Sequence, residues 1–356
     1  STIFKKYLYQ GLGKTHNIKI VLRKNSEIIE KVSGAEFIEV SRVSDFFNKK
    51  SNNLSKVIYH LIKRSSKFIK RYFLFGVDLL LIFSVRRKIS FLLKDSNIDL
   101  VLTVSHPIES HFSVPSKNKY RIMQYWFEQW YINPNEPIST YAAKKIRKLA
   151  INKSQSSIYS NTTLLKENSI LSNKSSFVIG LISDDGHKLK HLPNQNIEFG
   201  YYGNFDPKIR NIDHLYEALK RTNQSSLIVG NGKELLSENK LKVINKRISG
   251  LTVKFYEEST KNLFVILNNQ HNAWPGKLYS YSSLSSIIIV LYDLKNDIHL
   301  EIKKEFEYFE NFIFLENKLS TITTYVDSCK PQVKTVKNNK FHQDYVINEF
   351  NQIFKS

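Results

Sequence analysis

The feature that most constrains the fold is a polar stretch, residues 272–286, enclosed by two apolar runs. Residues 263–267 (Leu-Phe-Val-Ile-Leu) precede it, and residues 287–292 (Ile-Ile-Ile-Val-Leu-Tyr) follow it. Short runs that are apolar throughout are typical of strands buried on both faces of a parallel sheet. Pro275 suits the first turn of a short helix between them, because its missing N–H would have no helical partner there. We therefore expect a strand–helix–strand unit.

Lys277 falls in the first turn of that expected helix, where a cation opposes the helix dipole. A positive charge at this place indicates a bound anion, and a phosphate group suits both the lysine and the amides of the turn. A solvated lysine on an ordinary strand–helix–strand connection would explain the same residue without a ligand. The sequence leaves both interpretations open.

Apolar strand patterns alternate with helix patterns along the chain. We expect strands at 18–22, 36–40, 98–105, 120–126, 156–160, 197–202, 226–229, 251–256, 263–267, 287–292 and 311–315. We expect helices at 3–12, 54–93, 142–149, 162–167, 211–220, 318–327 and 344–354. Two successive alternations predict an α/β protein with two Rossmann-like doubly wound domains facing a cleft.

The domain boundaries follow from this alternation. Residues 1–182 form the expected N-terminal domain, and the polar, turn-rich residues 183–196 form a linker. Residues 197–340 form the C-terminal domain, and residues 341–356 form a terminal helix that we expect to pack back on the N-terminal domain. Because the chain starts directly in a helix pattern, we expect the first strand of the N-terminal domain to lie outside this sequence.

The chain is strongly basic, with 53 Lys and Arg against 32 Asp and Glu and a formal net charge of +21. Such a surplus indicates an anionic partner: nucleic acid, a lipid surface or a phosphorylated ligand. The sequence shows none of the usual nucleic-acid modules, and its positive charge is spread along the chain, so we expect no nucleic-acid partner. Cys329 is the single cysteine, which excludes a disulfide framework within the chain and fits a reducing cytoplasm.

The helical region 54–93 mixes basic residues with aromatic and aliphatic ones. This pattern is typical of an interfacial helix on anionic lipid, and it predicts a peripheral position at a membrane surface. A helix that covers a sheet and exposes a solvated basic face is the alternative. The residues expected to contact lipid include Lys63, Arg64, Lys67, Lys70 and Arg71.

Three residues of the first half are candidate catalytic groups. His106 and Glu109 follow the strand 98–105, and Glu128 follows the strand 120–126. Ligands of open α/β sheets bind at the carboxyl ends of strands, which is where these side chains are expected. A histidine followed by a proline in a loop is equally often structural.

Several segments together resemble one family. They are residues 199–207 (Phe-Gly-Tyr-Tyr-Gly-Asn-Phe-Asp-Pro), 227–232 (Leu-Ile-Val-Gly-Asn-Gly) and 275–281 (Pro-Gly-Lys-Leu-Tyr-Ser-Tyr). The second half resembles the C-terminal domain of GT-B glycosyltransferases, particularly glycosyltransferase family 4. In the first half, residues 102–107 (Leu-Thr-Val-Ser-His-Pro) and 127–130 (Phe-Glu-Gln-Trp) resemble two further elements of that family.

The resemblance implies transfer of a sugar from a nucleotide-sugar to a glycan acceptor, by a hexosyltransferase that retains configuration and needs neither metal nor prosthetic group. We expect a UDP-sugar as donor, bound in the C-terminal domain, and a lipid-linked acceptor bound in the N-terminal domain. This fits bacterial surface or capsular polysaccharide synthesis by a cytoplasmic protein at the inner face of the membrane.

The resemblance also implies a donor site. Its candidate residues are Gly203, Asn204, Lys208, Arg210, Gly230, Asn272, Gly276, Lys277, Leu278 and Ser280. Arg210 and Lys277 are the cations expected to stabilise the departing diphosphate, and the glycines allow close backbone approach. His106 is expected at the sugar or its reacting centre, Glu128 at the acceptor or in proton transfer, and Glu109 is a further catalytic candidate beside His106.

The sequence departs from the family at three of these positions. Asn272 and Ser280 stand where the family has its paired glutamates, and Asn204 stands where an arginine is common. A carboxylate can accept two hydrogen bonds from ribose hydroxyls, whereas a serine offers a weaker contact. These departures support an alternative: a non-catalytic GT-B protein that recognises a glycan or glycoprotein and acts as partner of an active glycosyltransferase.

Overall fold

The structure is a computed structural model that describes residues 2–23, 35–40, 77–95, 97–105, 108–115, 119–127, 140–182, 196–207, 209–268, 274–328 and 340–356. The chain divides into two compact units: residues 1–180 with 347–356 (unit 1), and residues 181–346 (unit 2). The expected linker, apart from residue 196, and most of the basic region 54–93 lie outside the described residues. Of the helices in the described ranges, none combines the length and the apolar character needed to cross a bilayer.

Unit 1 contains two parallel sheets in its described part. Strands β1 (Ile18–Arg23) and β2 (Ala35–Val40) pair with each other. The second sheet has the order β3-β4-β5-β6, with strands β3 (Leu100–Val104), β4 (Arg121–Trp126), β5 (Ser156–Tyr159) and β6 (Ser175–Val178). The helices are α1 (Thr2–Gly13), α4 (Leu79–Asp95), α5 (Glu109–Ser113), α6 (Thr140–Ile151), α7 (Thr162–Ser169) and, from residue 347 onward, α13 (Gln343–Lys355).

Local sequence explains why α7 starts where it does. Asn161 has an extended backbone, and its Oδ1 accepts a hydrogen bond from the Leu164 amide at 2.9 Å. This bond satisfies one of the amides that a helix start leaves without a helical partner. At the other end of the chain, the Phe350 ring is buried and lies 5.3 Å from the Tyr125 ring, centroid to centroid. The last residues of α13 therefore belong to the core of unit 1.

Unit 2 is built on one six-stranded parallel sheet in the order β12-β11-β10-β7-β8-β9. The strands are β7 (Ile197–Tyr202), β8 (Ser226–Val229), β9 (Leu241–Ile244), β10 (Thr260–Ile266), β11 (Ile287–Tyr292) and β12 (Phe312–Glu316). The strand order reverses between β7 and β10, because β8 and β9 continue on one side and β11 and β12 on the other. In open α/β sheets this switch point, at the carboxyl ends of the strands, is the usual place for a ligand.

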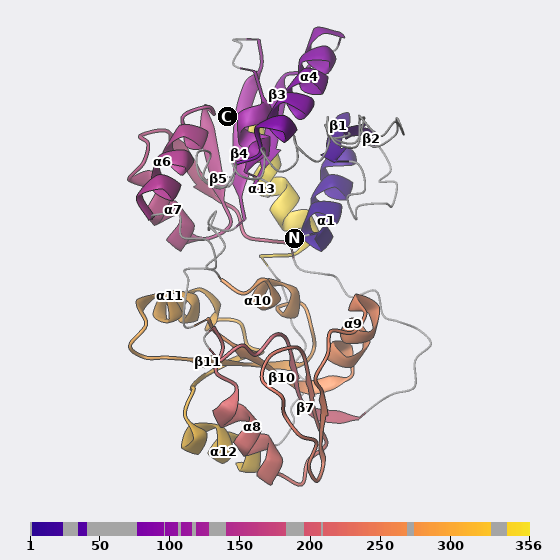
Figure 1. The fold of residues 1–356 in the computed structure, drawn as a ribbon, viewed down its shortest axis with the longest axis vertical. Coiled ribbons are helices and arrows are strands. Elements are labelled where there is room, and N and C mark those ends of the chain that lie inside the picture. The colour runs from indigo at the N-terminus through magenta and orange to yellow at the C-terminus, as the bar shows by residue number, and fades with distance from the viewer. Residues whose placement is uncertain are drawn as a thin grey trace, which may run out of the picture. The chain divides into compact units, whose positions relative to one another are not determined.

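Helices cover both faces of this sheet (Figure 1). On one face lie α9 (Gly250–Glu258), α10 (Gly276–Tyr281) and α11 (Asp297–Phe306); on the other lie α8 (Asp213–Arg221) and α12 (Leu319–Ser328). Strands β7 and β11 are buried along their whole length. Coverage on both faces explains why their sequences are apolar throughout rather than alternating, and it confirms the predicted class of parallel α/β sheet.

Two predictions about unit 2 are wrong. Residues 251–256, predicted as a strand, belong to helix α9, which starts after Ser249; the Ser249 hydroxyl oxygen caps it by accepting from the Thr252 amide at 3.2 Å. The β-branched and aromatic residues of this segment favour a strand locally, but the cap and the packing of α9 on the sheet decide otherwise. Pro275 lies one residue before α10 with an extended backbone, not inside its first turn.

Four further elements of the structure were not predicted from the sequence. They are strand β6 and helix α5 in unit 1, and strand β9 and helix α11 in unit 2.

Candidate functional site

A small cavity opens at the switch point of the unit 2 sheet, where β7 and β10 end. Its volume is about 120 Å³, and we call it the Arg210 pocket. Its lining comes from the ends of both strands, from the loop after β7 and from the start of α10: Tyr201, Tyr202, Arg210, Phe264, Val265, Ile266, Pro275, Gly276 and Lys277. The structure thus brings together three residues that the sequence nominated for a donor site: Arg210, Gly276 and Lys277.

Arg210 is held by a neutral partner. Its Nε donates a hydrogen bond of 2.6 Å to Oδ1 of Asn268, two residues beyond the end of β10. Beside it, burial raises the pKa of the Tyr201 phenol, and the positive charge of Arg210 opposes that rise. Arg210 therefore enters the pocket as a cation whose Nε is fixed without a countercharge from Asn268.

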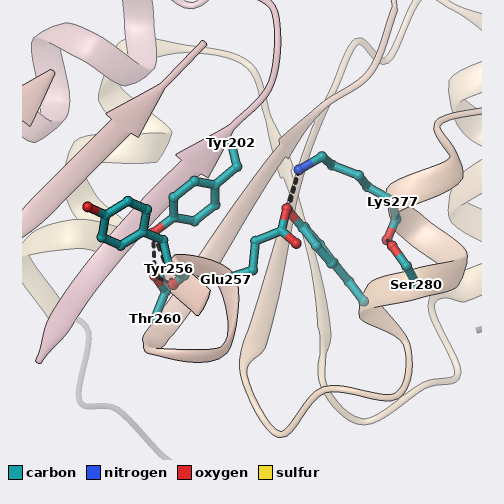
Figure 2. Close-up of polar contacts among 7 residues, drawn as sticks. Tyr202, Tyr256, Glu257, Thr260, Lys277 and Ser280 are labelled. Atoms are coloured by element: carbon teal, nitrogen blue, oxygen red, sulfur yellow. Dashed lines mark hydrogen bonds and ion pairs between the residues drawn. The ribbon is translucent and has the colours of Figure 1, made fainter. Parts of the chain in front are cut away.

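Lys277 is held by a negative partner (Figure 2). Its ammonium forms an ion pair with Oε1 of Glu257, in the last turn of α9, and donates a hydrogen bond of 2.7 Å to the Tyr281 hydroxyl. The Tyr281 hydroxyl in turn donates to the same Glu257 oxygen at 2.6 Å. The ammonium also lies 5.8 Å and 5.0 Å from the ring centroids of Tyr202 and Tyr281.

This environment shifts the proton equilibrium of Lys277. Burial lowers its pKa, and the Glu257 carboxylate works against that shift. Burial, reinforced by Glu257, raises the pKa of Tyr281, so this phenol stays protonated and donates to the carboxylate. The anion that faces Lys277 in the structure is thus a protein carboxylate, and its ammonium is tied to two neighbouring side chains.

The other two donor-site candidates on α10, Leu278 and Ser280, are not among the residues that line the pocket. Leu278 is fully buried in the hydrophobic core, and its amide donates to the Pro275 carbonyl at 3.0 Å. The Ser280 hydroxyl donates to the Lys277 carbonyl of the same helix at 3.3 Å. Because α10 has only six residues, its dipole is short, and the anion-binding role rests on the side chains rather than on the helix start.

The glycines differ in what their missing side chain permits. A methyl group at Gly230 would lie 1.9 Å from the Gly203 carbonyl oxygen, so these two loops can touch only with glycine at 230. A methyl group at Gly203 would lie 3.6 Å from Nη1 of Arg210, and one at Gly276 would meet nothing within 4 Å. Asn204 is exposed, and its carbonyl accepts from the Tyr201 hydroxyl at 2.9 Å.

Among the catalytic candidates only Glu109 falls in the described ranges. It opens α5 in unit 1 and is 5% exposed, and its Oε1 accepts a hydrogen bond of 2.7 Å from the Asp78 amide just before α4. This contact ties two helices together. The other candidates, His106 and Glu128, and the donor-site candidates Lys208 and Asn272 lie outside the described residues. Within the described ranges no three or more His, Cys, Asp or Glu side chains converge as metal ligands would.

A second, larger cavity of about 350 Å³ lies at the carboxyl ends of β10, β11 and β12. We call it the Asn317 pocket. It is lined by Asn211, His214, Leu267, Leu291, Tyr292, Asp293, Leu294, Lys295, His299, Glu316, Asn317 and Lys318. None of these residues was nominated from the sequence, although Asp293 and Asn317 directly follow strands, the signal that pointed to His106 in unit 1.

No family model matches the chain, and no curated protein sequence matches it. Solved structures do. Sucrose-phosphate synthase from Thermosynechococcus elongatus is similar with a TM-score of 0.60 and 11% identity, over 99% of this chain and 92% of that one. HepE from Anabaena in complex with UDP and glucose is similar with a TM-score of 0.60 and 8% identity, over 99% and 95%.

A putative UDP-N-acetylglucosamine 2-epimerase from Listeria monocytogenes is similar with a TM-score of 0.55 and 11% identity, over 100% of this chain and 93% of that one. Each likeness spans nearly the whole of both chains, and at such low identity it indicates the fold alone. The chain therefore has the GT-B fold, with two Rossmann-like units built from parallel sheets and helices.

Proposed function

We propose that this protein is a glycosyltransferase that binds a UDP-sugar in unit 2 and transfers its sugar to a glycan acceptor. The observation that carries the proposal is the pair of cations, Arg210 and Lys277, that line one pocket at the switch point of the sheet. The likeness in fold to HepE, solved with UDP and glucose, and to sucrose-phosphate synthase supports the choice of donor and reaction.

The chemistry requires positive charge at this place. As a sugar leaves its diphosphate, negative charge gathers on the phosphate oxygens, and cations already in position stabilise that charge without reorganising. Arg210 suits this role because its guanidinium matches phosphate geometry and its Nε is already fixed by Asn268. Lys277 contributes once the diphosphate replaces Glu257 as its counter-ion. Since side chains supply the charge, the proposed reaction is metal-independent, and retention of configuration is proposed with it.

The first test is a calorimetric titration of the full chain with UDP, GDP and dTDP. We expect selective binding of UDP. UDP release from a panel of UDP-sugars, measured with and without glycan acceptors, then separates transfer from epimerisation at the sugar. If a well-folded sample binds none of the nucleotides, the proposed activity is wrong.

The non-catalytic alternative has its own observations. The Ser280 hydroxyl, at the position of a family glutamate, is bonded to its own helix, and Lys277 is neutralised by Glu257. A GT-B protein that recognises a glycan or glycoprotein beside an active glycosyltransferase would need neither group for a donor. The same titration decides: the alternative gains support from a folded protein without nucleotide affinity.

The proposal also covers the acceptor. We propose a lipid-linked glycan at the inner face of a bacterial membrane, in surface or capsular polysaccharide synthesis. Helix α4 supports this, because Phe83 and Phe91 are 62% and 59% exposed and two helical turns apart. Arg87 lies between them on the same stripe, and the Lys88 ammonium lies 5.9 Å from the Phe91 ring centroid. Exposed aromatic rings among basic residues are typical of helices that sit on anionic lipid.

Vesicle sedimentation tests this surface. The double variant F83S/F91S should weaken binding to vesicles of phosphatidylglycerol and phosphatidylcholine by about tenfold or more, since burying a phenylalanine stabilises by about 1.5–3 kcal/mol. L251S is the matched control, because Leu251 is 71% exposed on α9 of unit 2. Unchanged binding by F83S/F91S would remove α4 from the membrane surface.

A further inference from the structure

The Asn317 pocket lies at the carboxyl ends of the strands of the unit 2 sheet, as the Arg210 pocket does, but its lining differs in charge. Its walls come from the ends of three neighbouring strands and from the start of α8 and α12. At about 350 Å³ it falls at the small end of the range of ligand pockets, and it is large enough for a small ring but not for a whole nucleotide-sugar.

The pocket wall is already fixed around Asn317. The Asn317 amide donates to the Tyr292 carbonyl at 2.9 Å, and its own carbonyl accepts from Nδ1 of His214 at 2.8 Å. Its side-chain Nδ2 donates to the Asn211 carbonyl at 3.3 Å. Three of the four polar groups of Asn317 therefore have partners that hold the residue in one orientation.

The fourth polar group is the side-chain oxygen. Oδ1 of Asn317 is buried, and among the residues that the structure describes it has no hydrogen-bond partner. A buried acceptor without a donor is costly, and Asn317 lines the pocket, so a donor on a ligand in the pocket would satisfy this oxygen. A hydroxyl group is a suitable donor.

The charges of the pocket balance. Glu316 is paired with Lys318 at 2.8 Å, and Oδ1 of Asp293 accepts from the Lys295 amide at 2.9 Å. Two carboxylates and two ammonium groups line the cavity. A balanced lining with many hydrogen-bonding groups suits an uncharged, polyhydroxylated ligand better than a phosphate.

The His299 imidazole, which lines the pocket, adds no charge. Nδ1 of His299 accepts from the Asp293 amide at 2.9 Å, so Nε2 carries the proton and donates to the Asn268 carbonyl at 2.9 Å. Both bonds require the neutral ring, and burial lowers the pKa of His299 in agreement with that. The second bond matters for position, because the Asn268 side chain also binds Arg210. One residue therefore joins the walls of the two pockets.

We propose that the Asn317 pocket binds an uncharged sugar ring through a hydroxyl that donates to Oδ1 of Asn317. This inference rests on the proposed function, in that the ring is the sugar of the UDP-sugar whose diphosphate lies at Arg210. Arg210 and Asn211 are consecutive, and each lines one of the two pockets, so a single ligand can reach both.

The test compares UDP with UDP-glucose, UDP-galactose and UDP-N-acetylglucosamine by calorimetry on the full chain. In N317A the best-bound UDP-sugar should lose about tenfold in affinity, the effect of one lost hydrogen bond, while UDP itself stays within about twofold. N317L, which keeps the side-chain volume without the acceptor, should behave the same and covers the case that N317A is unstable. N223A is the matched control, because Asn223 is exposed before β8 at the opposite edge of the sheet.

A second arm needs no nucleotide. Ligand-observed NMR with free glucose, galactose and N-acetylglucosamine should show contact with the wild type and N223A, and weaker contact with N317A. Sugar contact that depends on Asn317, in a protein that binds no UDP, would support the pocket and overturn the proposed function. If the protein binds UDP, and N317A binds UDP-sugars and free sugars as well as wild type does, the Asn317 pocket is not the sugar site. The proposed function would then still stand.

Discussion

The two pockets of unit 2 lie at the same edge of the same sheet, yet they differ in charge and size. The Arg210 pocket has about a third of the volume of the Asn317 pocket, 120 against 350 Å³, and two cations line it. The larger pocket has as many carboxylates as ammonium groups. On the proposed function, the pocket whose lining residues include cations but no carboxylate is the expected place for a diphosphate, because a diphosphate needs cations more than it needs space.

The two cations of the Arg210 pocket also differ from each other. The Nε of Arg210 is held by an amide oxygen, whereas the ammonium of Lys277 is held by a carboxylate. On the proposed function, an arriving phosphate would add to the first arrangement but would have to displace Glu257 from the second. We therefore expect Arg210 to carry most of the affinity for a diphosphate.

The largest expected effect is on stability, at the backbone contact between Gly230 and Gly203. In G230A the new methyl group would meet the Gly203 carbonyl at 1.9 Å, far inside contact distance. We expect the free energy of unfolding to fall by about 3 kcal/mol or more, measured by urea denaturation. G250A is the control, since a methyl group at Gly250 meets nothing within 4 Å. Equal midpoints for G230A and wild type would contradict the observed contact between the two loops.

The next effect separates the two pockets directly. R210A should weaken UDP about 10- to 150-fold in calorimetry, because a hydrogen bond to a charged group contributes about 1.5–3 kcal/mol. R221A, at the far end of α8 with an exposed side chain, should leave UDP affinity unchanged. If R210A and R221A behave alike, the Arg210 pocket is not the phosphate site and the comparison fails.

The sequence predicted the sheets of unit 2 better than the partners of its site. Apolar runs such as 287–292 identify strands because burial on both faces dictates their composition, and Arg210 and Lys277 follow from the motif resemblance. The ion pair could not be foreseen, because residues 251–256 favour a strand and only as helix α9 does this segment bring Glu257 to Lys277.

The Asn317 pocket was missed for a different reason. Its polar residues come from the ends of separate strands, and only the order β12-β11-β10 brings those ends together. A sequence gives each strand end singly, so Asn317 looks like any polar residue after a strand. The unpartnered oxygen, which makes it informative, is a property of the folded wall.

A smaller effect tests the internal counter-ion. E257Q removes the charge that competes with a phosphate for Lys277 and keeps an acceptor for Tyr281. We expect UDP affinity to rise about fivefold and the free energy of unfolding to fall by about 1 kcal/mol, as for a partly exposed ion pair. Calorimetry and urea denaturation measure the two. A drop in UDP affinity would show that Glu257 positions Lys277 for the ligand rather than competing for it.

The same pair makes a prediction about pH. Burial holds the pKa of Lys277 below its usual value of 10.5. The folded state thus binds fewer protons than the unfolded state between the lowered pKa and 10.5, and over that range this group makes stability rise with pH. UDP affinity should fall over the same range as the ammonium loses its proton. Because Glu257 opposes the shift, the fall should begin at lower pH in E257Q. The titration of UDP itself affects wild type and E257Q equally, so a difference between their pH profiles reports on the protein. Identical profiles of UDP affinity against pH would remove Lys277 from the site.

The smallest expected effect on stability is at Gly276, where a substitution should instead change the affinity for UDP. A methyl group there meets nothing within 4 Å, and alanine forms a helix more readily than glycine, so G276A should keep or raise the free energy of unfolding by up to about 1 kcal/mol. Gly276 nevertheless lines the Arg210 pocket. If a phosphate approaches its backbone, G276A should lose UDP affinity several-fold while binding of free sugars at the Asn317 pocket stays unchanged. If G276A binds UDP as well as wild type, the phosphate does not approach the start of α10. The phosphate site would then be assigned to Arg210 alone, and Arg210 and Lys277 would not share one ligand.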